Sequence, residues 1–180
     1  HSLINTTQPR GWSSQLDTEP GIALLAERKW RTPETKLAGG IVAVDAIPHL
    51  GAALGNVYTH VNVGTMVRLG RNLSFDYGPP RISPSLAGAG YFTPRDNFSW
   101  YVFAGIEGRA VAHNIFLDGS LFRDEDPSVS SNTFVTDLQA GLVVQVLQTQ
   151  VAFTYVERAE EFAEQTEPQR FGAVSISRKF

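Results

Sequence analysis

Residues 57–69 alternate without a break between two kinds of side chain. The odd positions carry valine, threonine and leucine, whereas the even positions include Tyr58, His60, Asn62 and Arg68. Successive side chains of a β-strand point to opposite faces, so the pattern predicts a strand with one apolar and one mostly polar face. The segment is longer than the usual strand of about 5–6 residues, and a tilted transmembrane strand needs about 9–11. It therefore predicts a membrane-spanning strand whose apolar face meets lipid.

The same alternation recurs along the chain and predicts further strands. It is present in residues 21–31, 37–54, 98–112, 134–146, 151–156 and 170–180. The first of these segments also contains good helix formers, and a strand is preferred there because the period recurs downstream. With residues 57–69 the total is about seven strands. Residues 1–20, 71–97 and 157–169 are predicted to be loops, and 32–36 and 114–119 to be turns.

Length and composition narrow the class of protein. The 180 residues amount to one domain, spanning 1–180. With 15 Lys and Arg against 18 Asp and Glu there is no basic excess, so no nucleic-acid partner is expected. The absence of cysteine excludes a disulfide framework and a thiolate metal site. No apolar run approaches the roughly 18 residues of a transmembrane helix, which excludes a helical membrane protein but not a barrel.

A soluble barrel of the lipocalin kind would show the same alternation with its apolar face inside. Strand length, aromatic residues near strand ends and the last residue favour the membrane instead. The aromatic residues are Trp30, Trp100, Tyr155 and Phe180, which match the aromatic girdles of outer-membrane barrels. Phe180 also closes an alternating strand, which resembles the C-terminal signal of bacterial outer-membrane proteins. The expected fold is therefore an all-β, antiparallel transmembrane β-barrel.

An odd number of strands is incompatible with a closed bacterial outer-membrane barrel. Such barrels have an even number of strands, at least eight, and an unclosed sheet leaves backbone N–H and C=O groups unpaired in lipid. The sequence also begins at His1 and not at Met. We therefore expect a partial barrel whose N-terminal strands are missing from this chain.

Several short motifs occur in order along the sequence. They are His1, residues 9–12 (PRGW), 19–20 (EP), Asp45, 54–56 (LGN), Gly64, 68–70 (RLG), 78–80 (GPP), 114–119 (NIFLDG) and Phe180. Together they resemble the lipid A 3-O-deacylase family of Gram-negative outer membranes. The resemblance covers essentially the whole chain as the C-terminal part of a family member. It implies a twelve-stranded antiparallel barrel, of which this chain supplies about the last seven strands.

The resemblance also implies an activity. Family members remove the 3′-linked acyloxyacyl group of lipid A by ester hydrolysis, with calcium as the divalent cation, whose ligands the sequence leaves unknown. His1 matches the catalytic histidine, and an imidazole can take a proton from the attacking water while a cation polarises the ester carbonyl. Thr7 stands where the family has a carboxylate, and the acidic and amide partners near the family's N-terminus have no counterpart here.

The implied surroundings follow from the same resemblance. They are a lipopolysaccharide substrate, contacts with outer-membrane lipids, recognition of Phe180 by the assembly machinery, and a monomer in the outer membrane of a Gram-negative cell. The alternatives are a non-catalytic structural or binding barrel of the same family, a small-molecule pore, and a phospholipase with a Ser-His-Asn arrangement. Bulky interior side chains of both signs disfavour the pore.

The remaining polar residues have structural interpretations. His49, His60 and His113 lack the spacing of a metal motif. Charged residues of both signs are predicted to face the interior, where they rigidify a small barrel more often than they perform chemistry. These residues are Glu27, Lys29, Arg68, Glu107, Arg109 and Asp137. The acidic residues 124–126 are predicted to be a solvated loop.

Overall fold

The computed structural model describes residues 20–79, 92–93, 98–122 and 128–179. Within these ranges the strands are β1 (Ala23–Lys29), β2 (Thr35–Leu37), β3 (Val42–Gly55), β4 (Tyr58–Arg71), β5 (Ser99–Asn114), β6 (Phe134–Val146), β7 (Thr149–Arg158) and β8 (Gln169–Arg178). The helical turns are η1 (Ala38–Gly40), η2 (Leu73–Phe75) and α1 (Ile115–Asp118). None of the helices in the described ranges is long and apolar enough to cross a membrane. The all-β class predicted from the sequence is confirmed.

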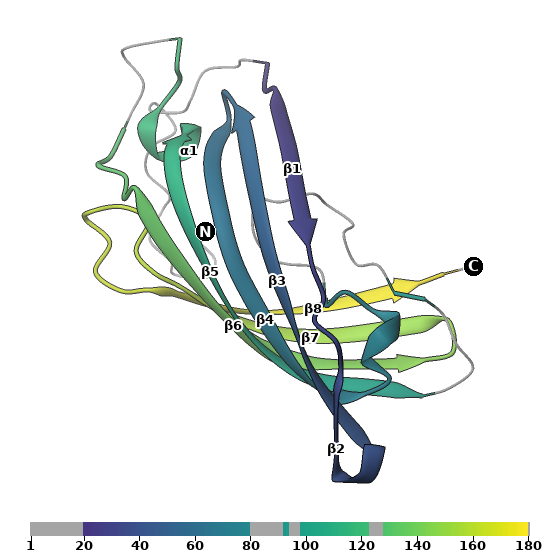
Figure 1. Cartoon of the computed structure of the whole chain (residues 1–180). Helices are drawn as coiled ribbons and strands as arrows, with labels where there is room; N and C mark the ends of the chain where they lie inside the picture. The colour runs from purple at the N-terminus through teal and green to yellow at the C-terminus, as the bar shows by residue number, and fades with distance from the viewer. Residues whose placement is uncertain (1–19, 80–91, 94–97, 123–127, 180) are drawn as a thin grey trace, which may run out of the picture.

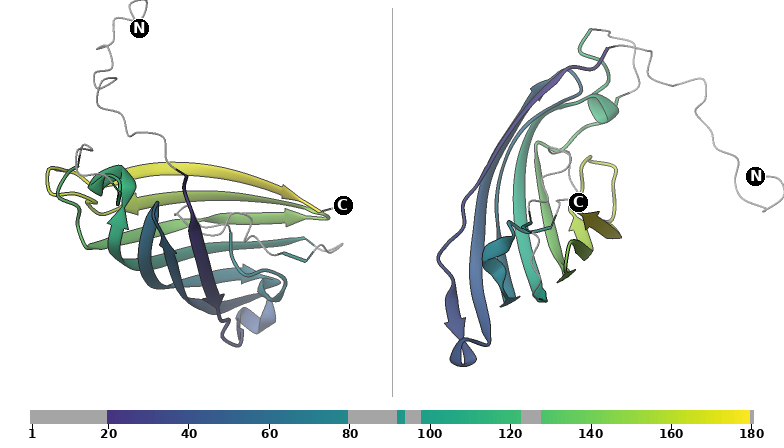
Figure 2. Two further views of the ribbon diagram at one scale, coloured as in Figure 1. Left: turned by 90° about the horizontal axis from the view of Figure 1, so that it is seen from above. Right: turned by 90° about the vertical axis from the view of Figure 1, so that its right-hand side faces the viewer.

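The strands form one antiparallel sheet in the order β1-β3-β4-β5-β6-β7-β8. β1 pairs with the second half of β3, and β2 pairs with its beginning. The sheet is strongly curved, with β1 at one edge and β8 at the other (Figures 1 and 2). Among the described residues these two edges do not pair with each other, so the sheet is open. A long, curved antiparallel sheet of this kind has the shape of part of a barrel wall.

The two faces of β4 are divided as the alternation predicts. Val61 and Val63, on the apolar face, are 54% and 61% exposed. His60, Asn62 and Arg68, on the other face, are buried on the concave side of the sheet. The apolar face therefore points outward and the polar face points inward, which is the arrangement of a membrane barrel and the reverse of a soluble one.

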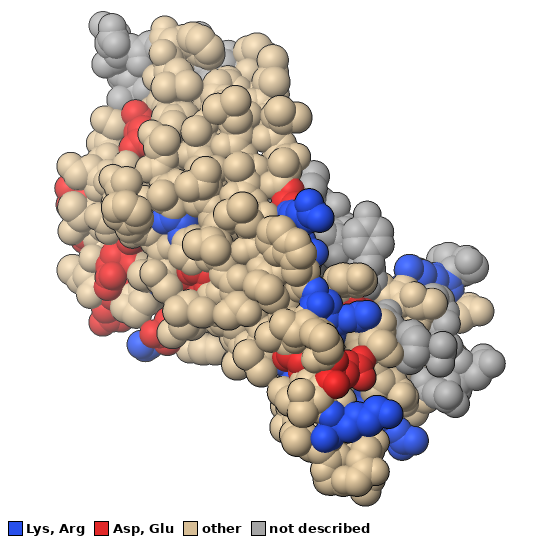
Figure 3. Space-filling view, in the orientation of Figure 1, with Lys and Arg blue, Asp and Glu red and all other residues tan. Residues whose placement is uncertain are grey.

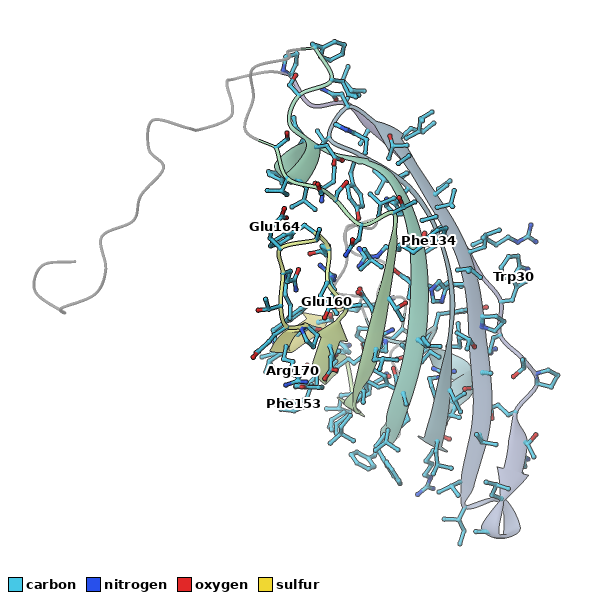
Figure 4. All side chains as sticks on the ribbon, turned by 90° about the vertical axis from the view of Figure 1, so that its left-hand side faces the viewer. Trp30, Phe134, Phe153, Glu160, Glu164 and Arg170 are labelled. Atoms are coloured by element: carbon cyan, nitrogen blue, oxygen red, sulfur yellow. The ribbon has the colours of Figure 1, made fainter. Side chains whose placement is uncertain are left out.

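The same division extends over the neighbouring strands. The convex face, viewed in Figure 3, is mostly uncharged over β3, β4 and β5, and charged side chains gather toward its margins. Its exposed side chains include Leu50, Ile106 and Leu138. Trp30 lies on this outer side just after β1 (Figure 4), where Arg28 stacks on its ring at 5.4 Å. A continuous outward apolar surface is what a hydrocarbon environment requires.

The connection between β3 and β4 is tight, as the sequence predicts. Only Asn56 and Val57 separate the two strands. The Asn56 side chain accepts a hydrogen bond from the backbone N–H of Ile22 at 2.7 Å and donates one to the carbonyl of Pro20 at 2.9 Å. The turn therefore also fixes the start of β1, which is a strand and not the alternative helix.

Two local predictions were wrong. Residues 35–37 form strand β2, which pairs with residues 42–44 of β3, in place of part of the predicted turn. Residues 115–118 form the single helical turn α1 at the end of β5. The Asn114 side chain caps α1 by accepting from the backbone N–H of Phe116 at 3.2 Å. Gly119, with φ of 78°, ends it.

The connection after β4 turns into the concave side of the sheet. Leu73 in η2 is fully buried against a cluster that includes Ile47, Met66 and Phe103. Asp76 then forms an isolated antiparallel bridge with Phe92. The described residues 73–79, named the inward segment below, therefore line the interior of the sheet near the ends of β4 and β8. This segment contains Asp76, one of the buried polar residues of the interior.

Candidate functional site

The concave face carries the polar and charged side chains that a functional site would use. Alternation along β3, β4, β5 and β6 places buried polar residues in neighbouring positions of adjacent strands. They form two groups. The Arg68 cluster contains Asp45, Arg68, Asp76, Tyr101 and Gln150, and the Arg109 cluster contains His49, Asn62, Glu107, Arg109, Asp137 and Arg158.

The Arg68 cluster is centred on a guanidinium with 0% exposure. Arg68 Nε and Nη2 donate to the two carboxylate oxygens of Asp45, directly opposite on β3, at 2.9 and 2.5 Å. Nη1 donates to the Asp76 carboxylate at 3.1 Å, and Nη2 donates to the carbonyl of Leu73 at 3.1 Å. Paired donors in the plane of the guanidinium match a carboxylate in a bidentate manner. Arg68 therefore joins β3 and β4 to the inward segment.

Asp76 is the acceptor on which this cluster converges. Besides the bond from Arg68, its carboxylate accepts from the Tyr101 hydroxyl at 2.8 Å, from the Gln150 amide at 2.5 Å and from the backbone N–H of Gly78. Burial raises the pKa of Asp76, and Arg68 together with these hydrogen bonds opposes the rise. Three of these partners lie on the strands β4, β5 and β7, so the carboxylate fixes the inward segment against the sheet.

The Arg109 cluster is a row of alternating charges across three strands. Arg109 Nη2 lies 2.8 Å from both carboxylate oxygens of Asp137 on β6. Arg158 on β7 donates to the same two oxygens at 3.0 and 3.1 Å. On the other side, Arg109 Nε lies 3.7 Å from Glu107 Oε1. The row therefore ties β5, β6 and β7 together through shared carboxylates.

Glu107 extends this row to β3 and β4. Its Oε2 lies 3.0 Å from His49 Nε2 and accepts a hydrogen bond from the Asn62 amide at 3.1 Å. Gly64, opposite both His49 and Glu107 in the sheet, leaves room for the imidazole, because a Cβ there would meet that ring. The prediction that Glu107, Arg109 and Asp137 face the interior is confirmed, as it is for Arg68.

The histidines of the described chain lie apart from one another. His113, at the end of β5, lies 3.0 Å from the carbonyl of Asn56 and 3.8 Å from Asp118 in α1. It joins the β3–β4 turn to α1. His60 packs against Tyr58, with 4.6 Å between the ring centroids and an angle of 50° between the ring planes. In the described ranges, no group of three or more His, Asp or Glu side chains is arranged to hold a metal ion.

The interior carboxylates therefore do not form a calcium site. Asp45, Asp76, Glu107 and Asp137 each face an arginine within 4 Å. A divalent cation would have to displace a buried guanidinium, which would lose its own hydrogen bonds. The described residues do not fit the cation that the sequence resemblance implies.

The catalytic residue predicted from the sequence, His1, lies outside the described residues, as do Phe180 and the acidic residues 124–126. What the sequence missed is the convergence on Asp76. Arg68 and Asp45 share the interior face by their alternation, but Asp76 belongs to a connection without a period. No sequence signal marks it as the second carboxylate of Arg68.

Comparisons with known proteins also indicate an outer-membrane protein. A family model described as "Outer membrane protein LpxR" matches residues 1–180. Among solved structures, the chain is similar to LpxR from Salmonella typhimurium, with a TM-score of 0.80 and 22% sequence identity. The match covers 100% of this chain and 59% of that chain, and at this identity it shows the fold. A comparison with curated proteins finds no match.

Proposed function

Because the chain belongs to the family of the outer membrane protein LpxR, we propose that it is part of a lipid A 3-O-deacylase in the outer membrane of a Gram-negative bacterium. The substrate is lipopolysaccharide, from which the enzyme removes the 3′-linked acyloxyacyl group as a monomer. The observation that carries the proposal is the family match over the full chain. The outward apolar face and the inward polar face support the membrane placement.

The proposed reaction is ester hydrolysis with His1 as general base. The imidazole takes a proton from water as the water oxygen attacks the ester carbonyl carbon, and returns the proton to the leaving alkoxide when the C–O bond breaks. The products are a free fatty acid carrying its secondary acyl chain and a lipid A hydroxyl. The calcium requirement rests on the family resemblance, and no step is assigned to the ion because the described carboxylates do not fit it.

The two interior clusters support this proposal as a scaffold. Their charges are held by one another and by hydrogen bonds, and they connect β3 through β7 and the inward segment. A rigid wall can hold loop residues at one end in fixed positions, as catalytic geometry requires. The chemistry is therefore proposed for residues outside the clusters.

Mass spectrometry of lipid A tests the proposal. Cells making the full-length protein should yield lipid A without the 3′-linked acyl chains, and His1→Ala should restore the unmodified pattern. Removal of calcium by a chelator should do the same for the purified enzyme. A gel-mobility assay that separates folded from unfolded barrels serves as the control, since His1→Ala is expected to fold normally. Unmodified lipid A from cells making the wild type would contradict the proposed deacylase activity and favour the alternative, a non-catalytic barrel of the same family.

A further inference from the structure

A groove of about 280 Å³ lies on the outward face of β4, β5 and β6. Two rows of paired residues define it: Val61, Ala110 and Phe134 in one row, and Val63, Gly108 and Thr136 in the next. The central strand contributes only the two small residues, whereas the flanking strands contribute larger side chains. The groove therefore follows β5, with Gly108 and Ala110 as its floor. Its volume is close to the lower limit, about 300 Å³, of sites that hold small molecules.

Gly108, in the middle of the sheet, and Gly172, in the edge strand β8, differ from the other strand glycines that the structure describes. At Gly51, Gly64, Gly70 and Gly141 a Cβ would lie closer than a normal contact to neighbouring atoms of the chain. At Gly108 a Cβ would meet nothing within 4 Å. The close approach of neighbouring atoms therefore accounts for those glycines but not for this one. Glycine inside a strand loses side-chain packing, and it often marks a place where a ligand approaches the backbone.

The chemistry of the groove selects a hydrocarbon chain. Phe134 and Val63 at its sides are 79% and 61% exposed. The groove continues the outward apolar surface of the sheet, which faces lipid in a family of outer-membrane proteins. A narrow apolar channel in such a surface fits one flexible acyl chain. A polar ligand would lose its hydrogen bonds there.

The position of the groove along the strands places it at the level of the outer leaflet. The groove lies near the beginning of β4 and β6, at the end of the sheet that carries α1 (Figure 1). Besides the tight β3–β4 turn, the α1 end carries the long connections 115–133 (β5 to β6) and 159–168 (β7 to β8). The opposite end carries the two-residue turn between β6 and β7 and the end of β8. Outer-membrane barrels have short turns on the periplasmic side and longer loops on the cell surface. The described part of the long β4–β5 connection turns into the interior and does not alter this orientation.

We infer that the groove over Gly108 and Ala110 holds one acyl chain of lipid A from the surrounding outer leaflet. The inference rests on the outer-membrane placement proposed above, and it concerns a groove formed by residues of β4, β5 and β6. A chain held there is favoured over bulk lipid by packing, since both environments are apolar. Filling the groove with a side chain should remove this preference without affecting the wall.

The experiment is native mass spectrometry of the full-length protein incubated with purified lipid A. Gly108→Leu fills the groove, and its Cβ has room. Gly172→Leu is the matched control, because Gly172 lies in β8, outside the groove, and its Cβ would also meet no close contact. We expect the wild type and Gly172→Leu to retain one lipid A. Gly108→Leu should retain about threefold less, as expected when several carbon–carbon contacts of the acyl chain are lost.

A second pair of variants covers the possibility that Gly108→Leu does not fold. Phe134→Ala removes one wall of the groove and should also lower retention, whereas Phe153→Ala, an exposed outward aromatic on β7, should not. Equal retention by Phe134→Ala and wild type would overturn the inference, as would equal retention by folded Gly108→Leu. Preferential retention of phosphatidylethanolamine over lipid A would overturn it too. Because retention is measured apart from deacylation, loss of activity with retention intact would count against the proposed enzyme and not against the groove.

Discussion

The two interior clusters solve the burial of charge in different ways. In the Arg68 cluster, one arginine serves two carboxylates and a backbone carbonyl, and it joins strands to the inward segment. In the Arg109 cluster, the Asp137 carboxylate accepts hydrogen bonds from two arginines, Arg109 and Arg158. The first has a single cation on which its carboxylates depend. The second has a spare cation for Asp137, so the two should respond differently to the loss of an arginine.

The largest effect is expected for Arg68→Met. This change leaves Asp45 and Asp76 buried beside one another without their shared cation. Breaking a buried ion pair from one side costs about 3–5 kcal/mol. The free energy of unfolding of the full-length protein in lipid vesicles, measured by urea titration, should fall by that amount. Arg71→Met, an exposed arginine at the end of the same strand, is the matched control and should have little effect.

A loss no larger for Arg68→Met than for Arg71→Met would contradict the assignment of Arg68 as the centre of its cluster. Asp45→Asn combined with Arg68→Met provides a further check. Because both partners are then neutral, the double variant should be more stable than the sum of the two single losses predicts.

A smaller loss is expected for Arg109→Met. Asp137 keeps two hydrogen bonds from Arg158 at 3.0 and 3.1 Å, so its charge stays compensated. Glu107, which lies 3.7 Å from Arg109, keeps its contacts with His49 and Asn62. The change should cost about 1.5–3 kcal/mol, the range for hydrogen bonds to charged groups. The same urea titration measures it. If the loss equals or exceeds that of Arg68→Met, the second arginine does not compensate and the contrast between the clusters disappears.

The contrast between the two clusters also shows which interior contacts can be predicted from the sequence. Alternation places Arg68, Glu107, Arg109 and Asp137 on the inner face, because period two is a property of each strand by itself. The Arg109 cluster follows from strand register. The Arg68 cluster is only half predictable, since Asp76 reaches Arg68 through tertiary packing of the connection around Leu73.

The short elements were missed for a related reason. β2 has three residues, too few for a period, and its identity as a strand depends on pairing with residues 42–44. α1 follows Asn114, whose capping side chain is a weak signal by itself. The outward groove arises from two small residues that become adjacent to larger ones only when β4, β5 and β6 are in register. The chemistry predicted for His1 remains a prediction, because that residue lies outside the described ranges.

A modest loss is expected for Tyr101→Phe, which sharpens the account of the Arg68 cluster. The hydroxyl donates one hydrogen bond of 2.8 Å to Asp76, while the ring stays in place against Phe103. Arg68, Gln150 and Gly78 still hold the carboxylate. The cost should be about 1 kcal/mol, as for a single hydrogen bond. A loss as large as that of Arg68→Met would mean that Tyr101, and not the arginine, holds the inward segment.

The smallest effect is expected for Arg170→Gln, which tests whether burial is what gives the interior pairs their weight. Arg170 Nε lies 2.9 Å from Glu157 Oε2, a distance like those of the interior pairs, but its side chain is 59% exposed on the outer side of β8. Solvent screens an exposed pair of this kind, and holding two long side chains in one geometry costs conformational entropy. The urea titration should show no measurable change in the free energy of unfolding. If Arg170→Gln destabilised the protein as much as Arg109→Met does, the distance between the charges would decide their contribution, and the distinction between interior and exterior would fail.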